Sequence, residues 1–119
     1  MSPDYTYRAD VFMVHDGDTV TLNIDLGLRV WLMHQKVRLA GIDAPELGRE
    51  DKAGEKARDA LRDLIAKYGE HVIIQTRKDT REKYGRWLAV IYVGKEGFNA
   101  NDWMVGAGHA TRWVEKVKT

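Results

Sequence analysis

The stretch from residue 37 to residue 46, which reads VRLAGIDAPE, constrains the fold more than any other part of the sequence. Apolar and polar residues alternate through its first part, as in a β-strand whose two faces differ. Pro45 cannot continue a strand ladder and holds the residue before it in an extended conformation. We therefore predict a strand that ends in a rigid corner, with the carboxylates of Asp43 and Glu46 on either side of the proline.

A second acidic corner is predicted by residues 15–18, HDGD, which lie between two apolar runs. Gly17 is expected to adopt a positive φ at this reversal, with Asp16 and Asp18 on either side of it. Taken alone, this sequence is better interpreted as an ordinary hairpin turn, because Asp-Gly is common turn chemistry. If the two corners meet, their carboxylates would repel one another, and a hard divalent cation with oxygen ligands would relieve that repulsion.

The periodicity of the whole sequence predicts an α+β domain. We predict strands over residues 5–14, 19–26, 29–41, 71–76 and 86–93, and helices over residues 54–68 and 100–107. The third strand is long enough that it should be bent or bulged, and Asn99 or Asn101 should cap the second helix. Five curved strands, with one helix between the third and fourth and a short helix after the fifth, indicate a small barrel of the oligonucleotide-binding (OB-fold) type.

Length and composition narrow the possibilities further. The chain has 119 residues, which suits a single domain over residues 1–119 with an ordered core at about 5–114. No apolar run approaches 18 residues, so no membrane partner is expected. Zero cysteines exclude disulfides, thiol catalysis and thiolate zinc sites. The N-terminus lacks the features of a secretory signal, so we expect an intracellular protein, or a secreted or phage protein whose leader was removed.

Two arginines point to phosphate chemistry. Arg38 shares its strand with Asp43, and Arg86 opens the fifth strand after a loop rich in Lys and Arg. Guanidinium groups match phosphate oxygens in charge and in bidentate geometry, which suits the negative charge that develops during phosphodiester hydrolysis. The alternatives are a salt bridge beneath the turn for Arg38 and a solvated strand end for Arg86. Exposed ion pairs contribute only about 0–1 kcal/mol, so neither alternative explains a need for arginine.

Three motifs together resemble the staphylococcal nuclease (thermonuclease-like) family: DGDT at residues 16–19, RLAGIDAPE at 38–46 and KYGR at 83–86. Each motif alone is only moderately specific, whereas the three in one small domain are highly specific. The resemblance extends from about residue 10 to residue 113 and implies the same barrel that the periodicity indicates.

The resemblance implies a calcium site built from both acidic corners. Asp18 and Asp43 match direct ligands, and the main-chain carbonyl of Ala44 matches a third. Asp16 matches an outer-sphere carboxylate that is held through water. Magnesium would use the same oxygens, so calcium is favoured over magnesium by the resemblance alone.

The resemblance also implies catalytic and nucleotide-binding roles. Arg38 and Arg86 match residues that contact the scissile phosphate, and Glu46 matches the general base that orders or deprotonates the attacking water. Lys83 and Tyr84 match residues that hold the terminal phosphate of a bound nucleotide.

Trp113 lies where the family often has an aromatic residue that stacks on a base, although core packing is the alternative. The implied activity is calcium-dependent hydrolysis of DNA, with RNA as a further substrate, at low sequence specificity and with 3′-phosphate products. We expect a monomer, with a dimer as the alternative. A catalytically inactive nucleic-acid- or protein-binding module on the same fold is the rival interpretation, but such domains lose the acidic and arginine set that is complete here. A passive single-strand binder would not need Glu46.

Overall fold

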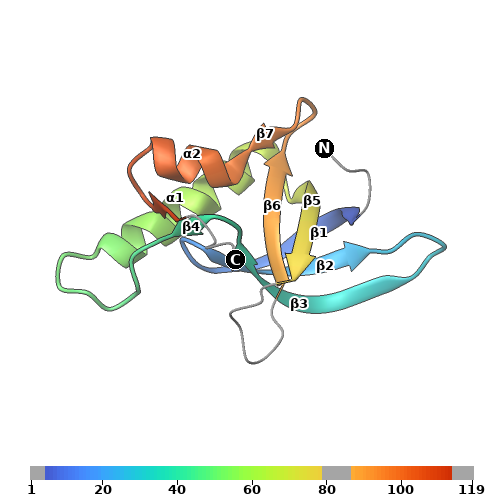
Figure 1. Ribbon diagram of the computed structural model, residues 1–119, viewed down its shortest axis with the longest axis horizontal. Coiled ribbons are helices and arrows are strands. Elements are labelled where there is room, and N and C mark those ends of the chain that lie inside the picture. The colour runs from blue at the N-terminus through green and yellow to red at the C-terminus, as the bar shows by residue number, and fades with distance from the viewer. Residues whose placement is uncertain (1–4, 79–86, 114–119) are drawn as a thin grey trace, which may run out of the picture.

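Five strands form a barrel in the structure, a computed structural model that describes residues 5–78 and 87–113. The barrel strands are β1 (Thr6–Asp16), β2 (Thr19–Asp25), β3 (Trp31–Leu39), β5 (His71–Lys78) and β6 (Trp87–Val93). Antiparallel ladders join them in the order β3-β2-β1-β5-β6, and a parallel ladder between β3 and β6 closes the barrel (Figure 1). The predicted α+β barrel of OB-fold type is therefore confirmed.

The remaining elements are short strands and two helices. Helix α1 (Ala53–Tyr68) lies between the third and fourth barrel strands, and α2 (Ala100–Gly106) follows the fifth, both as predicted. The two-residue strands are β4 (Ile42–Asp43), β7 (Phe98–Asn99) and β8 (Thr111–Arg112). Strands β4 and β8 pair with each other as a separate small sheet beside the barrel. Within the described part of the chain, neither helix is long and apolar enough to cross a membrane.

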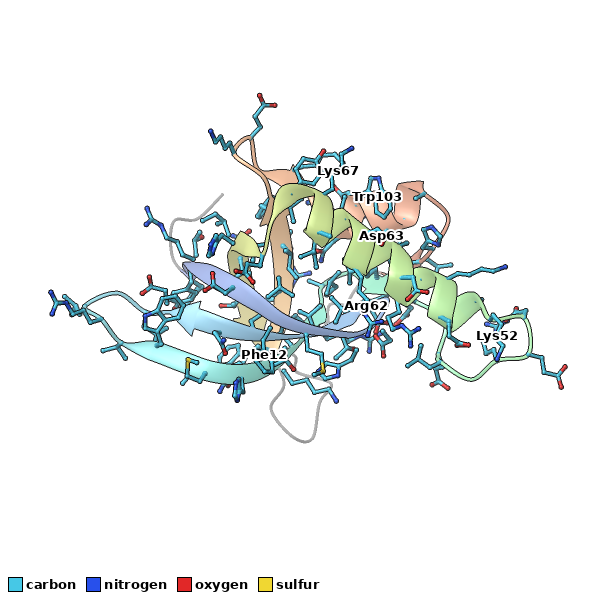
Figure 2. The ribbon with its side chains drawn as sticks, turned by 180° about the vertical axis from the view of Figure 1, so that it is seen from behind. Phe12, Lys52, Arg62, Asp63, Lys67 and Trp103 are labelled. Carbon is cyan, nitrogen blue, oxygen red and sulfur yellow. The ribbon has the colours of Figure 1, made fainter. Side chains whose placement is uncertain are left out.

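Helix α1 covers the barrel with one apolar face. Its residues Ala57, Leu61, Leu64 and Ile65 are buried in the same core cluster as the inward side chains of the barrel strands. Figure 2 shows α1 beside β1, with Arg62 between the two elements. The guanidinium of Arg62 donates a hydrogen bond of 3.2 Å to a main-chain carbonyl of β1. The helix is thus held against the strand that leads into the HDGD turn.

The third barrel strand departs from the predicted range at both ends. It begins at Trp31 and ends at Leu39, because Gly41 has a φ of 77° and interrupts the alternation. Ala40 and Ile42 are consequently both buried. The predicted bulge is present at His34, which has a φ of 55° and donates its main-chain N–H to the Asn23 side chain over 2.8 Å.

The two candidate caps of α2 have different roles. Asn99 is the cap, since its side chain accepts the N–H of Asp102 over 3.0 Å. Asn101 is buried and makes three hydrogen bonds with main-chain groups of the strands. It accepts the N–H of Ile91 and donates to the carbonyls of residues 40 and 89, which fixes α2 to β6 and to the end of β3.

Candidate active site

The two acidic corners meet because Gly17 has no side chain. A Cβ atom added to Gly17 would lie 2.6 Å from the Cβ of Ala44 and 2.7 Å from the Cβ of Ala57. The prediction that Gly17 has a positive φ is wrong, since the glycines with positive φ are at other positions. Glycine is needed at this position for close approach, which brings the HDGD turn against both the proline corner and α1.

Asp18 joins the two corners through hydrogen bonds. Its carboxylate accepts the N–H of Ala44 over 2.9 Å and the hydroxyl of Thr19 over 3.1 Å. Its own N–H donates to the carboxylate of Asp16 over 3.0 Å. The side chain of Asp18 is only 13% exposed. The Asp18 carboxylate of the HDGD turn therefore lies against the main chain of the proline corner.

The surroundings of Asp18 disfavour its negative charge. Burial raises the pKa of Asp18 above its usual value, and hydrogen bonding and repulsion from Asp16 raise it further. The Ala44 N–H and the Arg38 guanidinium act in the opposite direction. A carboxylate in this position would gain from additional positive charge nearby.

Arg38 lies between the two carboxylates. Its Nη2 atom is 3.7 Å from Oδ2 of Asp18 and donates a hydrogen bond to Oδ1 of Asp43. The side chain of Arg38 is 18% exposed, whereas that of Asp43 is 50% exposed. The Nε atom of Arg38 is buried and has no hydrogen-bond partner among the described residues. An unpaired buried donor costs about 1–3 kcal/mol, which an oxygen of a bound ligand would offset.

The oxygen atoms at this place suit a hard cation but form an incomplete cage. The carboxylates of Asp18 and Asp43 both lie beside the Arg38 guanidinium, and hard divalent ions prefer oxygen ligands. Among residues 5–78 and 87–113, no group of three or more Asp, Glu or His side chains converges closely enough to hold a metal ion. An ion bound here would therefore take part of its coordination from water or substrate.

The segment that carries Glu46 is pressed against the first turn of α1. A Cβ atom on Gly54 would lie 2.0 Å from the main-chain oxygen of Glu46, so only glycine fits. The N–H of Gly48 also donates to the carboxylate of Glu55 over 2.9 Å. The Glu46 side chain itself is exposed. The sequence pattern indicates only that a helix begins near Gly54. It does not show the contact with Glu46, because that residue lies eight positions earlier in the chain.

Trp113 donates hydrogen bonds to the segment that leads into the proline corner. Strand β8 pairs with β4, and the main-chain N–H of Trp113 donates to the carbonyl of Gly41 over 2.9 Å. Its indole N–H donates to the carbonyl of Ile42 over 2.8 Å. The ring is half-buried, and its centroid lies 6.0 Å from the guanidinium carbon of Arg38. The predicted site residue is therefore close to Arg38.

The structure brings together Asp16, Asp18, Arg38, Asp43, Ala44 and Trp113. Three predicted site residues, Lys83, Tyr84 and Arg86, lie outside the described residues. The described part of β6 begins at Trp87, whose Cα partner on β3 is Val37, the neighbour of Arg38.

Comparison with known proteins identifies relatives for most of the chain. The staphylococcal nuclease homologue family matches residues 36–119. A thermonuclease of Staphylococcus hyicus is 30% identical over 100 residues, which are 81% of this chain and 53% of that protein. An uncharacterized endonuclease of Haemophilus influenzae is 35% identical over 106 residues, 89% of this chain and 51% of that protein. A micrococcal nuclease of Shigella flexneri is 36% identical over 86 residues, 72% of this chain and 42% of that protein.

The chain spans about half the length of these curated relatives. The family match nevertheless covers more than half of the chain and includes the end of β3, the proline corner and β8. Together with the closed barrel, these matches show that the chain belongs to the staphylococcal nuclease homologue family.

Proposed function

We propose that the protein is a calcium-dependent nuclease that hydrolyses phosphodiester bonds of DNA, and of RNA as a further substrate, with low sequence specificity. The observation that carries this proposal is the position of Arg38 between Asp18 and Asp43, with its Nε donor buried and unused among the described residues. A guanidinium group that can turn from a carboxylate to a phosphate oxygen is suited to bind a phosphodiester in a bidentate manner. Nuclease activity is named for three relatives, which supports the same conclusion.

The proposed metal ligands are Asp18, Asp43 and the main-chain carbonyl of Ala44, with Asp16 in the outer sphere. Calcium bound there would polarise a phosphate oxygen and hold water near the phosphorus. The partly buried carboxylate of Asp18, whose pKa is raised, would be stabilised in its ionised form by such an ion. The hydrogen bond that the Asp18 carboxylate accepts from the Ala44 N–H holds the HDGD turn against the proline corner.

Arg38 and Arg86 are proposed to stabilise the charge that develops on the phosphate. In this proposal Arg38 turns its Nη2 from Asp43 to a phosphate oxygen and donates its Nε to a second oxygen. The role of Arg86 rests on the family resemblance, since this residue is not among those described. Preorganised donors of this kind typically contribute about 10²–10³ in rate.

Glu46 is proposed to activate the attacking water, by accepting its proton or by ordering it for in-line attack. The water oxygen forms a bond to phosphorus, the bond to the 5′ oxygen breaks, and that oxygen takes a proton from solvent. The products are a 3′-phosphate and a 5′-hydroxyl. Lys83 and Tyr84 would hold a terminal phosphate of the bound strand.

The test is cleavage of heat-denatured DNA in calcium, in magnesium and with a chelator. We expect calcium-dependent degradation to 3′-phosphate ends, reduced about 10²–10⁴-fold in Glu46→Gln. Glu50→Gln is the matched control, because Glu50 is an exposed glutamate in the same loop. If the wild-type protein binds DNA but cleaves none with any metal, the catalytically inactive binding module becomes the better interpretation.

A further inference from the structure

Arg77 and Arg38 lie in one row of paired residues that runs across three neighbouring strands of the barrel. Leu88 on β6 is the Cα partner of Arg38 on β3 and of Arg77 on β5. Neighbouring strands lie about 4.8 Å apart, so the two arginine Cα atoms are roughly 10 Å apart. Directly paired residues project to the same face of a sheet.

That face is the outer one. Val37 and Leu39, on either side of Arg38, belong to the hydrophobic core, as does Ala89 next to Leu88. Leu88 is fully buried but lies outside this core cluster, which places it on the opposite face of β6. Arg38 and Arg77 therefore point toward the same outer surface of the barrel.

A cleft on this side of the barrel includes Arg77 in its lining. Its lining includes Gly41, Arg77, Val90, Arg112 and Trp113, and we call it the Arg77 cleft. Trp113 belongs to both places, because its ring also lies 6.0 Å from the Arg38 guanidinium. A ligand held by Arg38 can thus extend past the tryptophan into the Arg77 cleft.

The Arg77 cleft carries an excess of positive charge. Arg112 is paired with Asp102 at 3.1 Å, and both side chains are more than half exposed. Arg77 is exposed and makes no ion pair with any residue in the described ranges 5–78 and 87–113. The amide of Asn101, which also lines the cleft, is fully used in hydrogen bonds to main-chain groups. The groups left to bind a ligand are cationic, which suits an anion.

We propose, on the basis of the proposed nuclease function, that the Arg77 cleft binds the substrate phosphate next to the scissile one. Arg77 is its principal contact and Arg112 a second. Two guanidinium groups on Cα atoms roughly 10 Å apart contact different phosphates along one strand. The preferred substrate is consequently a polynucleotide rather than an isolated phosphodiester.

The test compares a long and a short substrate in calcium. The long substrate is a 20-nucleotide single-stranded DNA, and the short one is bis-p-nitrophenyl phosphate, which has one phosphate. Arg77→Gln should raise KM for the DNA about fivefold with kcat unchanged, and should leave hydrolysis of the short diester unchanged. The slope of log KM against log salt should fall by about 0.7, as expected for one lost phosphate contact to a single strand.

Lys95→Gln is the matched control. It removes the same charge from an exposed side chain in the turn beyond the far end of β6, roughly 20 Å from the Leu88 row. Arg77→Gln should differ from this control in KM for DNA but not in thermal unfolding. Equal kinetics of the two variants, or an equal loss on both substrates with Arg77→Gln, would overturn the proposal.

Failure of the proposed function itself gives a different result. If the wild-type protein hydrolyses neither substrate, binding of a fluorescent 20-nucleotide DNA and of a mononucleotide replaces the kinetic comparison. Weaker binding of the DNA alone by Arg77→Gln would then support the phosphate contact without catalysis. Unchanged binding of both probes would refute it.

Discussion

Substitution of Gly17 by alanine should separate the two corners of the candidate site. The added methyl carbon would lie 2.6 Å from the Cβ of Ala44 and 2.7 Å from the Cβ of Ala57. Carbon atoms pack at about 3.5–4.0 Å, so each contact is too short by about 1 Å. Neither neighbour can turn away by changing a rotamer, because both contacts are made by Cβ atoms fixed to the main chain.

The magnitude follows from what must move. Overpacking of this kind costs typically about 1–3 kcal/mol. If the proline corner shifts, the hydrogen bond of 2.9 Å from Ala44 to Asp18 is lost as well. A partly buried charged acceptor without its partner adds about 1–3 kcal/mol, so we expect a total loss of about 2–6 kcal/mol in the free energy of unfolding.

The assay is urea unfolding followed by tryptophan fluorescence, beside DNA cleavage in calcium. Gly106→Ala is the control, since a Cβ atom at Gly106 meets nothing within 4 Å and its φ is not positive. That variant should be as stable as the wild type, or more stable by up to about 1 kcal/mol. A Gly17→Ala protein with wild-type stability and wild-type cleavage would refute the close-approach explanation.

Three further predictions concern charge and burial. The pKa of Asp18 is raised, so the stability linked to this carboxyl is lost as pH rises above its ordinary 3.8. Asp18→Asn should therefore be no less stable than the wild type in chelator at pH 7. It should lose DNA cleavage, and it should also lose the gain in unfolding free energy that calcium gives the wild type. That gain is about 2.7 kcal/mol at a calcium concentration of 100 times Kd. Asn101→Ala removes three buried hydrogen bonds to main-chain groups and should cost about 3–5 kcal/mol by urea unfolding. The hydrogen bond and the negative charge of Asp10 raise the pKa of the exposed His71. Any stability from this pair is lost as pH rises through the raised pKa of His71. Asp10→Asn should return the His71 pKa toward 6.5 in an NMR titration.

The barrel could be predicted from the sequence because the patterns that indicate its strands and helices are local. Alternation over residues 19–26 and helical spacing over residues 54–68 each report which face of one element is buried. The proline corner could also be predicted, since Pro45 restricts its own neighbours. The bulge in β3 could be expected from length, but its position at His34 depends on the side chain of Asn23 across the ladder.

Other features depend on contacts between distant segments, which local patterns do not contain. Gly17 has the composition of a turn glycine, and only its contacts with Ala44 and Ala57 show that space is the reason. The buried role of Asn101 requires knowledge of which carbonyls lie beneath α2. The row from Arg38 through Leu88 to Arg77 requires the register of two ladders.

The central claim is that Arg38 acts on phosphate from between two carboxylates, and Arg38→Lys tests it most directly. Lysine keeps the positive charge beside Asp18 and Asp43 but lacks the planar bidentate donor. The measurement is the single-turnover rate of cleavage of single-stranded DNA in saturating calcium, with unfolding checked in the same preparation. We predict a folded protein whose rate falls about 10²–10³-fold. A folded variant that cleaves within a few-fold of the wild-type rate would contradict the claim.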